Sequence, residues 1–139
     1  MRKPFLMMIV LMSLFTINSY AQCTENITTV KIPTTIGIVI YSNDVETIWN
    51  AIRFANFSKK QGDTVNVFLL GKGVELDNLI KTEKDLKEQT DVFLDNGGTI
   101  LGCGTCLQSR NNKEPKVCKF SSMKDLYELV RENKIVMTF

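Results

Sequence analysis

Short, nearly continuous apolar runs alternate along this chain with longer amphipathic stretches. Residues 36–41 (IGIVIY) and 64–70 (TVNVFLL) are rich in β-branched and aromatic side chains, which is typical of strands covered on both faces. Two later runs predict a third and a fourth strand, over residues 99–101 and 135–139. Between the strands, apolar residues recur at helical spacing, and this predicts a helix from 45 to 61, a short one over 75–80, and others from 83 to 96 and from 123 onward.

Polar caps and glycines mark the ends of these helices. Ser42–Asp44 precedes the first helix and Gly62 follows it, as N-cap residues and C-terminal glycines commonly do. Capping boxes are expected at two later helix starts: Thr82 with Asp85, and Ser122 with Asp125. The core-facing residues of the last helix are expected to be Met123, Leu126, Tyr127 and Val130.

Strands and helices that alternate at this length indicate βαβ units. We therefore predict a single three-layer α/β/α domain with a mainly parallel sheet over residues 34–139. Ligand sites of such sheets lie beyond the carboxyl ends of the strands. Three strand ends carry candidate residues and should meet there: Ser42–Asp44, Gly71–Gly73 and Cys103.

The first residues have the pattern of an export signal. Arg2 and Lys3 precede an uncharged apolar stretch, residues 5–15, that is too short to span a bilayer comfortably, and Ser19-Tyr20-Ala21 suits signal peptidase. We predict a signal peptide over 1–21 that is cleaved after Ala21, a polar leader over 22–33, and a periplasmic or secreted protein without stable membrane insertion. A retained anchor and a lipoprotein acylated at Cys23 are the alternatives.

Charge and composition narrow the chemistry. The chain has 17 basic and 15 acidic residues, and loss of Arg2 and Lys3 would leave 15 of each. Without a basic run interleaved with aromatic residues, a nucleic-acid partner is not expected. The chain has no histidine, which excludes Ser-His-Asp triads, Cys-His dyads and His-ligated metals, so we expect its chemistry to depend on its four cysteines.

Cys103 and Cys106 form a Cys-x-x-Cys pair directly after the third predicted strand. A thiol at the start of a turn or helix, or beside a cation, is more readily ionised, and Arg110 and Lys72 are the candidate cations. We expect Cys103 to be the nucleophile or sulfur carrier and Cys106 to resolve it or share its load. Lys72 and Gly73 belong to a glycine turn that we interpret as loop geometry first and as a wall of the site second.

Other readings of the cysteines stay open. The pair could be a static disulfide, which an oxidising compartment favours, or half of a zinc site with Cys23 and Cys118, or two unreactive residues. Four cysteines allow three pairings, and sequence does not decide whether Cys23 and Cys118 are joined.

Several segments together carry a family likeness. A strand runs into Gly71-Lys-Gly-Val-Glu-Leu76, a Gly-Gly-x-Ile strand leads to Cys103-x-x-Cys106 with Arg110 downstream, and the chain closes on Val136-Met-Thr-Phe139. With these marks, residues 36–139 resemble the DsrE/DsrF-like sulfur-relay family. In that family the cysteine at this strand end accepts sulfane sulfur as a persulfide and passes it to a partner's cysteine, a role that maps onto Cys103. Asn111 stands where the family often has glycine.

The resemblance implies a carrier of sulfane sulfur that uses a persulfide on Cys103, assisted by Cys106, without cofactor or metal, and the predicted export signal makes this a periplasmic carrier. Its expected partners are a sulfur donor or acceptor, either a protein or a small sulfur compound, and further copies of itself in a homo-oligomer. The expected substrate-binding residues are Arg110, Lys72, Gly73 and Asn43. A thiol–disulfide oxidoreductase that uses the same pair, and a non-catalytic interaction module with a structural disulfide, are the alternatives.

Overall fold

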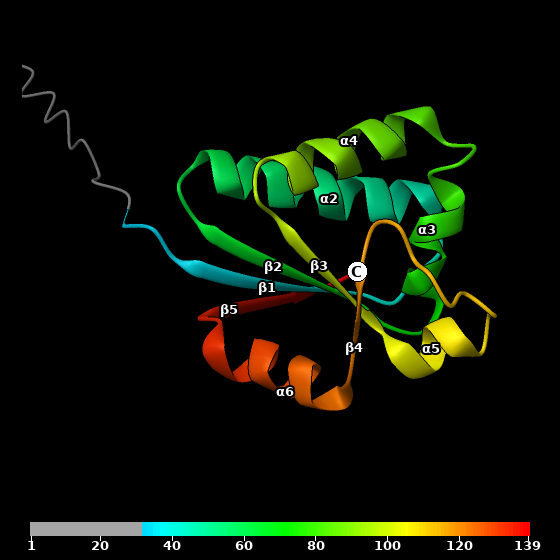
Figure 1. Cartoon of the computed structure of the whole chain (residues 1–139). Helices are drawn as coiled ribbons and strands as arrows, with labels where there is room; N and C mark the ends of the chain where they lie inside the picture. The colour runs from blue at the N-terminus through cyan, green and yellow to red at the C-terminus, as the bar shows by residue number, and fades with distance from the viewer. Residues whose placement is uncertain (1–31) are drawn as a thin grey trace, which may run out of the picture. The chain divides into compact units, whose positions relative to one another are not determined.

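The apolar runs of the sequence form a five-stranded sheet (Figure 1). The structure is a computed structural model that describes residues 32–139. The sheet has the order β4-β3-β2-β1-β5, and every neighbouring pair is parallel. Its strands are β1 (Thr35–Ile40), β2 (Thr64–Leu69), β3 (Thr99–Cys103), β4 (Lys119–Ser121) and β5 (Ile135–Thr138).

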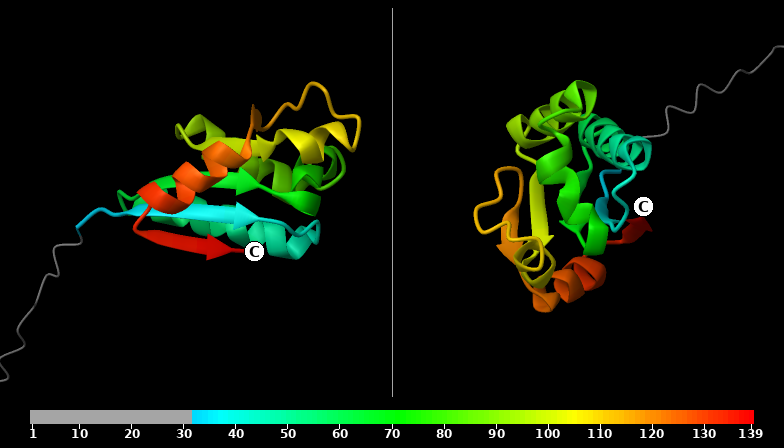
Figure 2. Two further views of the ribbon diagram at one scale, coloured as in Figure 1. Left: turned by 90° about the horizontal axis from the view of Figure 1, so that it is seen from below. Right: turned by 90° about the vertical axis from the view of Figure 1, so that its right-hand side faces the viewer.

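Helices cover both faces of the sheet. Figures 1 and 2 show α2 and α4 side by side on one face and α6 on the other. The long helices are α2 (Val45–Lys60), α4 (Lys84–Asp95) and α6 (Met123–Glu132). Three short helices lie beyond the carboxyl ends of the strands: η1 (Gly71–Glu75), α3 (Leu76–Leu79) and α5 (Gly104–Gln108). The predicted three-layer α/β/α arrangement is confirmed.

The two faces of the sheet bury unequal cores. Side chains alternate along a strand, so Ile38 and Ile40 point toward α2 and α4, where they join the main core with buried residues such as Ile52 and Phe93. Val39 points the other way and shares a smaller cluster with Phe68, Cys103 and Leu129 of α6. Cys103 therefore belongs to the thinner side of the molecule.

Two of the three predicted helix N-caps are present in the structure. Asp44 caps α2, because its carboxylate accepts a hydrogen bond of 2.8 Å from the Thr47 backbone N–H. Ser122 and Asp125 form the predicted capping box of α6. The predicted box of α4 is wrong: Glu83 is its N-cap without a side-chain hydrogen bond, and the Thr82 hydroxyl donates to a carbonyl of the preceding helix instead.

The predicted inner face of α6 is also wrong for three of its four residues. Met123, Tyr127 and Val130 are 59, 65 and 48% exposed, whereas Leu129 is buried and Leu126 is half-buried. The helix carries two adjacent apolar lines. Within residues 32–139, α6 is the one long helix on this face of the sheet, and its line through Leu126 and Leu129 packs toward the strands.

Several predictions concern residues 1–31 and lie outside the described part of the chain. These are the signal peptide over 1–21, most of the leader over 22–33, and any bond or acylation of Cys23. Among the helices of residues 32–139, none combines the length and the apolar character needed to cross a membrane.

Candidate thiol site

The carboxyl ends of β1, β2 and β3 lie next to one another in the sheet. In the sheet, Ile40 of β1 pairs with Leu69 of β2, which pairs with Gly102 of β3. The next residue along β3 is Cys103, and the next along β2 is Leu70, whose N–H donates to the Ile40 carbonyl over 2.8 Å. The thiol strand and the glycine turn therefore leave the sheet side by side, as the parallel topology predicts.

The glycine turn after β2 packs directly on the end of β1. Gly71 has φ +55°, in the left-handed region that glycine adopts at little cost, and this bends the chain into η1. A Cβ atom on Gly73 would lie 2.0 Å from the Ile40 carbonyl oxygen, so only glycine fits there. Gly73 thus sets the position of the turn, and the turn contacts Cys106 through the Gly71 N–H.

The two thiols occupy adjacent but different environments. Cys103 ends β3 directly before α5 and is 4% exposed. Cys106 lies one turn further on and is half-buried, and its Sγ accepts the Gly71 N–H over 3.3 Å. Cys103, Cys106 and Cys118 are all free thiols in the structure. The Cys-x-x-Cys pair is thus held between a strand end and a glycine turn.

Opposing effects act on the ionisation of Cys106. Burial raises its pKa most, and a hydrogen bond with the Cys103 thiol raises it further. The Gly71 N–H and the Arg110 charge lower the pKa, because both stabilise a thiolate. Cys106 is therefore mainly a thiol near neutral pH, and Gly71 and Arg110 are the groups that assist its ionisation.

Arg110 folds back over α5 and joins it to the glycine turn. Its Nε donates to Glu75 Oε1 over 2.5 Å, and its Nη1 donates to the Cys106 carbonyl over 3.1 Å. Both side chains of the ion pair are 28% exposed. The sequence singled out Arg110 but missed Glu75, whose only signal was its place in the glycine-turn motif.

Asn111 continues this turn in a left-handed conformation, with φ 54°. Asn is among the few residues other than glycine that adopt this region readily. The residue that replaces the family's frequent glycine therefore keeps the backbone conformation that a glycine would give.

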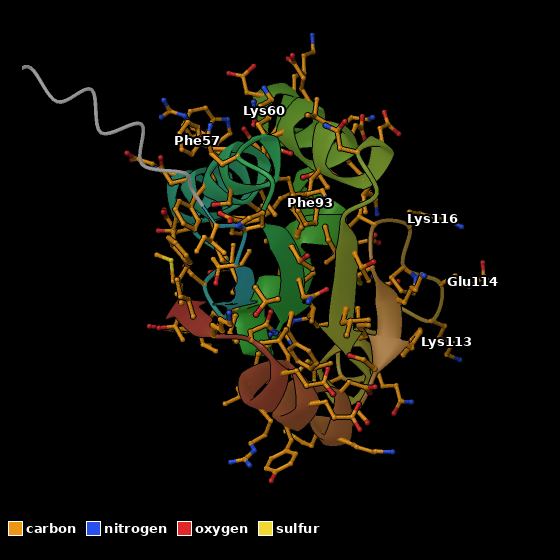
Figure 3. All side chains as sticks on the ribbon, turned by 90° about the vertical axis from the view of Figure 1, so that its left-hand side faces the viewer. Phe57, Lys60, Phe93, Lys113, Glu114 and Lys116 are labelled. Carbon is orange, nitrogen blue, oxygen red and sulfur yellow. The ribbon has the colours of Figure 1, made fainter. Side chains whose placement is uncertain are left out.

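A buried carboxylate fixes the loop that follows. Asp77 of α3 is 4% exposed and accepts the backbone N–H groups of Lys116 and Val117, over 2.6 and 3.0 Å, and the Asn112 side-chain amide over 3.0 Å. The charged side chains of this loop point away from the domain, as Figure 3 shows for Lys113, Glu114 and Lys116. Asp77 thus anchors the segment between α5 and β4, a role that was not predicted from the sequence.

Cys118, at the end of that loop, is a different kind of thiol. It is buried, and its Sγ lies 2.6 Å from the position that a Cβ on Gly102 would take. Burial, with a smaller contribution from the Asp77 charge, raises the pKa of Cys118 to about 11. Cys118 therefore stays protonated at neutral pH.

The remaining predicted residues lie at the same end of the sheet. Lys72 and Asn43 are exposed, and within residues 32–139 neither makes a hydrogen bond or ion pair with the thiols. In the same part of the chain, no group of three or more cysteine and acidic residues is arranged to hold a metal ion. The structure thus brings together Cys103, Cys106, Gly71 and Arg110.

Comparisons with known proteins agree with this architecture. The uncharacterised protein MJ0989 of Methanocaldococcus jannaschii is 29% identical over 100 residues, which are 68% of this chain and 88% of that protein. The YchN protein of E. coli has a similar crystal structure, with a TM-score of 0.66 and 15% identity over 78% of this chain and 100% of its own.

A second solved structure, the conserved protein of unknown function BT1422 from Bacteroides thetaiotaomicron, has a TM-score of 0.63 and 18% identity over 76% of this chain and 95% of its own. At such identities the two structures show the fold alone. The DsrE/DsrF-like family profile matches residues 35–139, which include all five strands and both site thiols. This chain belongs to the DsrE/DsrF-like family.

Proposed function

We propose that this protein carries sulfane sulfur as a persulfide on Cys103, with Cys106 as the second thiol of the site. Membership of the DsrE/DsrF-like family suggests a sulfur-relay-like role. The observation that carries the proposal is the place of Cys103, at the end of β3 with Cys106 one turn on and the Gly71 amide against that second sulfur.

The chemistry needs only the thiols of the site and a donor. The Cys103 thiolate attacks the sulfane sulfur of a persulfide or polysulfide, a new S–S bond forms at Cys103 Sγ, and the donor leaves as a thiolate or shorter polysulfide. The exchange is balanced without metal or cofactor. The apolar neighbours Val39, Phe68 and Leu129 shield the sulfur once it is bound.

Location and partners are further parts of the proposal. Export to the periplasm or beyond is supported by the sequence of residues 1–21. A sulfur donor or acceptor, either a protein or a small compound, follows from the chemistry. Self-association is supported by the exposed apolar side chains along α6 and β4: Phe120, Met123, Tyr127 and Val130.

The test uses a convenient property of the sequence. Trypsin cleaves after Lys87 and Arg110, and fragment 88–110 contains Cys103 and Cys106 but no other cysteine. The Cys106→Ser variant, treated with polysulfide and desalted, should give this fragment about 32 Da heavier. The Cys103→Ser variant should give an unmodified fragment.

Two controls accompany the loading test. Far-UV circular dichroism shows whether each variant keeps the wild-type fold, and Cys118→Ser should load as the wild type does. If the folded Cys106→Ser variant gains no mass, or Cys103→Ser loads equally well, the assignment of Cys103 as sulfur carrier is refuted.

A further inference from the structure

Cys103 and Cys106 share the first turn of α5, and both pack in the same apolar cluster. Cys103 Sγ lies in the apolar cluster under α6, and Cys106 contacts the same cluster from the half-buried first turn of α5. In a persulfide on Cys103, the inner sulfur is this same Sγ, and the outer sulfur is one bond further away.

We infer that Cys106 discharges the Cys103 persulfide by displacing its outer sulfur as hydrosulfide. The inference rests on the proposed function, because it starts from the loaded Cys103. By this step the site reduces sulfane sulfur to sulfide. Its second substrate is a dithiol that reduces the resulting disulfide.

The step is a thiol–disulfide exchange, and its atoms and electrons balance. The Cys106 thiolate attacks Cys103 Sγ, and a bond forms between the two Sγ atoms. The bond from Cys103 Sγ to the outer sulfur breaks, and that sulfur leaves with the electron pair as hydrosulfide. The proton of Cys106 passes to solvent. The sulfane sulfur is reduced to sulfide while the two thiols are oxidised to a disulfide, which an external dithiol then reduces.

The surroundings of Cys106 suit this role. The Gly71 N–H donates to its Sγ and stabilises the attacking thiolate, and Arg110 holds the first turn of α5 through the Cys106 carbonyl. Cys103 is the N-cap residue of α5 and Cys106 is the third residue of that helix, so the two thiols leave the same turn of the backbone. Because burial keeps the pKa of Cys106 raised, discharge should accelerate as the pH rises from 7 to 9.

Attack on the outer sulfur is the competing route. It would move the sulfane sulfur from Cys103 to the more exposed Cys106, with no sulfide released and no disulfide formed. The two routes differ in mass and in product, so one experiment separates them.

The experiment follows a single turnover in the full-length chain. Wild type and Cys106→Ser are loaded briefly with polysulfide at pH 6, desalted and shifted to pH 8. Sulfide in the filtrate is trapped with monobromobimane, and fragment 88–110 is weighed without reduction. Wild type should release about one sulfide per loaded chain while its fragment becomes about 2 Da lighter than the dithiol form. Cys106→Ser should keep its added mass of about 32 Da and release at least about tenfold less sulfide over the same time.

Added dithiothreitol, after removal of the sulfide, should restore the dithiol mass and permit a second loading. A wild-type fragment that keeps the added sulfur on Cys103, or carries it on Cys106 without sulfide release, overturns the inference and leaves the sulfur-carrier proposal standing. Failure of Cys106→Ser to load at all refutes that proposal instead. Cys118→Ser, as the matched control, should discharge like the wild type.

Discussion

The substitution Gly73→Ala tests whether close packing of the glycine turn on β1 positions the thiol site. A Cβ atom at this position would lie 2.0 Å from the Ile40 oxygen and 2.8 Å from its carbonyl carbon. Both neighbours are backbone atoms at the end of a central strand, so no side-chain rotation relieves the overlap. Gly73→Ala must therefore push η1 away from β1 by about 1 Å or more, and overpacking of this kind costs about 3 kcal/mol.

Gly97→Ala is the matched control. Gly97 has φ +73°, but no atom lies within 4 Å of the Cβ that alanine would add. This variant should cost only the backbone strain, about 1 kcal/mol. The comparison therefore separates a close backbone contact from a left-handed conformation, with the same chemical change in both.

Urea unfolding followed by circular dichroism measures both variants. With an m-value of about 1–3 kcal/mol per M, Gly73→Ala should lower the midpoint by about 1–3 M and Gly97→Ala by about a third of that. Gly73→Ala should also take the Gly71 N–H away from Cys106, and alkylation of Cys106 should then require a higher pH. Equal midpoints for the two variants would refute the reasoning about the turn.

Three further predictions follow from the same contacts. Asp77→Ala should lower the free energy of unfolding by about 3 kcal/mol, because it leaves buried N–H groups unpaired, and calorimetry measures this loss. The folded-state pKa of Cys118 is raised from 9.0 to about 11, so the buried thiol contributes to the stability of the fold below pH 9 and loses this contribution as the pH rises toward 11. Urea midpoints across this range should therefore fall less for Cys118→Ala than for the wild type. Arg110→Gln should raise the pKa of Cys106 and slow its iodoacetamide alkylation at pH 7, as measured in a Cys103→Ser background, because the Arg110 charge favours the thiolate; an unchanged rate would contradict the assigned role of Arg110.

The sequence predicted the sheet well where the strands are buried. β1, β2 and β3 are apolar runs, and β5 is apolar although it lies at an edge. β4 was missed because Lys119-Phe120-Ser121 is short, contains one apolar residue and forms the other edge, where burial does not select a hydrophobic pattern. The sheet interior is thus encoded locally, and this edge strand is not.

The same distinction applies to the site. Cys103, Cys106 and the glycine turn were identified because parallel strands bring their ends together whatever their loops do. Glu75 and Asp77 were missed because their partners, Arg110 and the loop before β4, lie at least 35 residues away along the chain. Charged residues in a short polar stretch carry no local sign of such contacts. The wrong face of α6 has a similar cause, since two apolar lines were present and the fold covers only one of them.

The central claim is that the sulfur enters on Cys103, and fragment-ion sequencing of residues 88–110 tests it most directly. The fragment is taken from the Cys106→Ser variant after polysulfide loading and is sequenced without reduction. The account predicts that the added mass of about 32 Da lies between Gly102 and Gly104, on Cys103. A folded variant whose fragment carries no added sulfur at that position would contradict it.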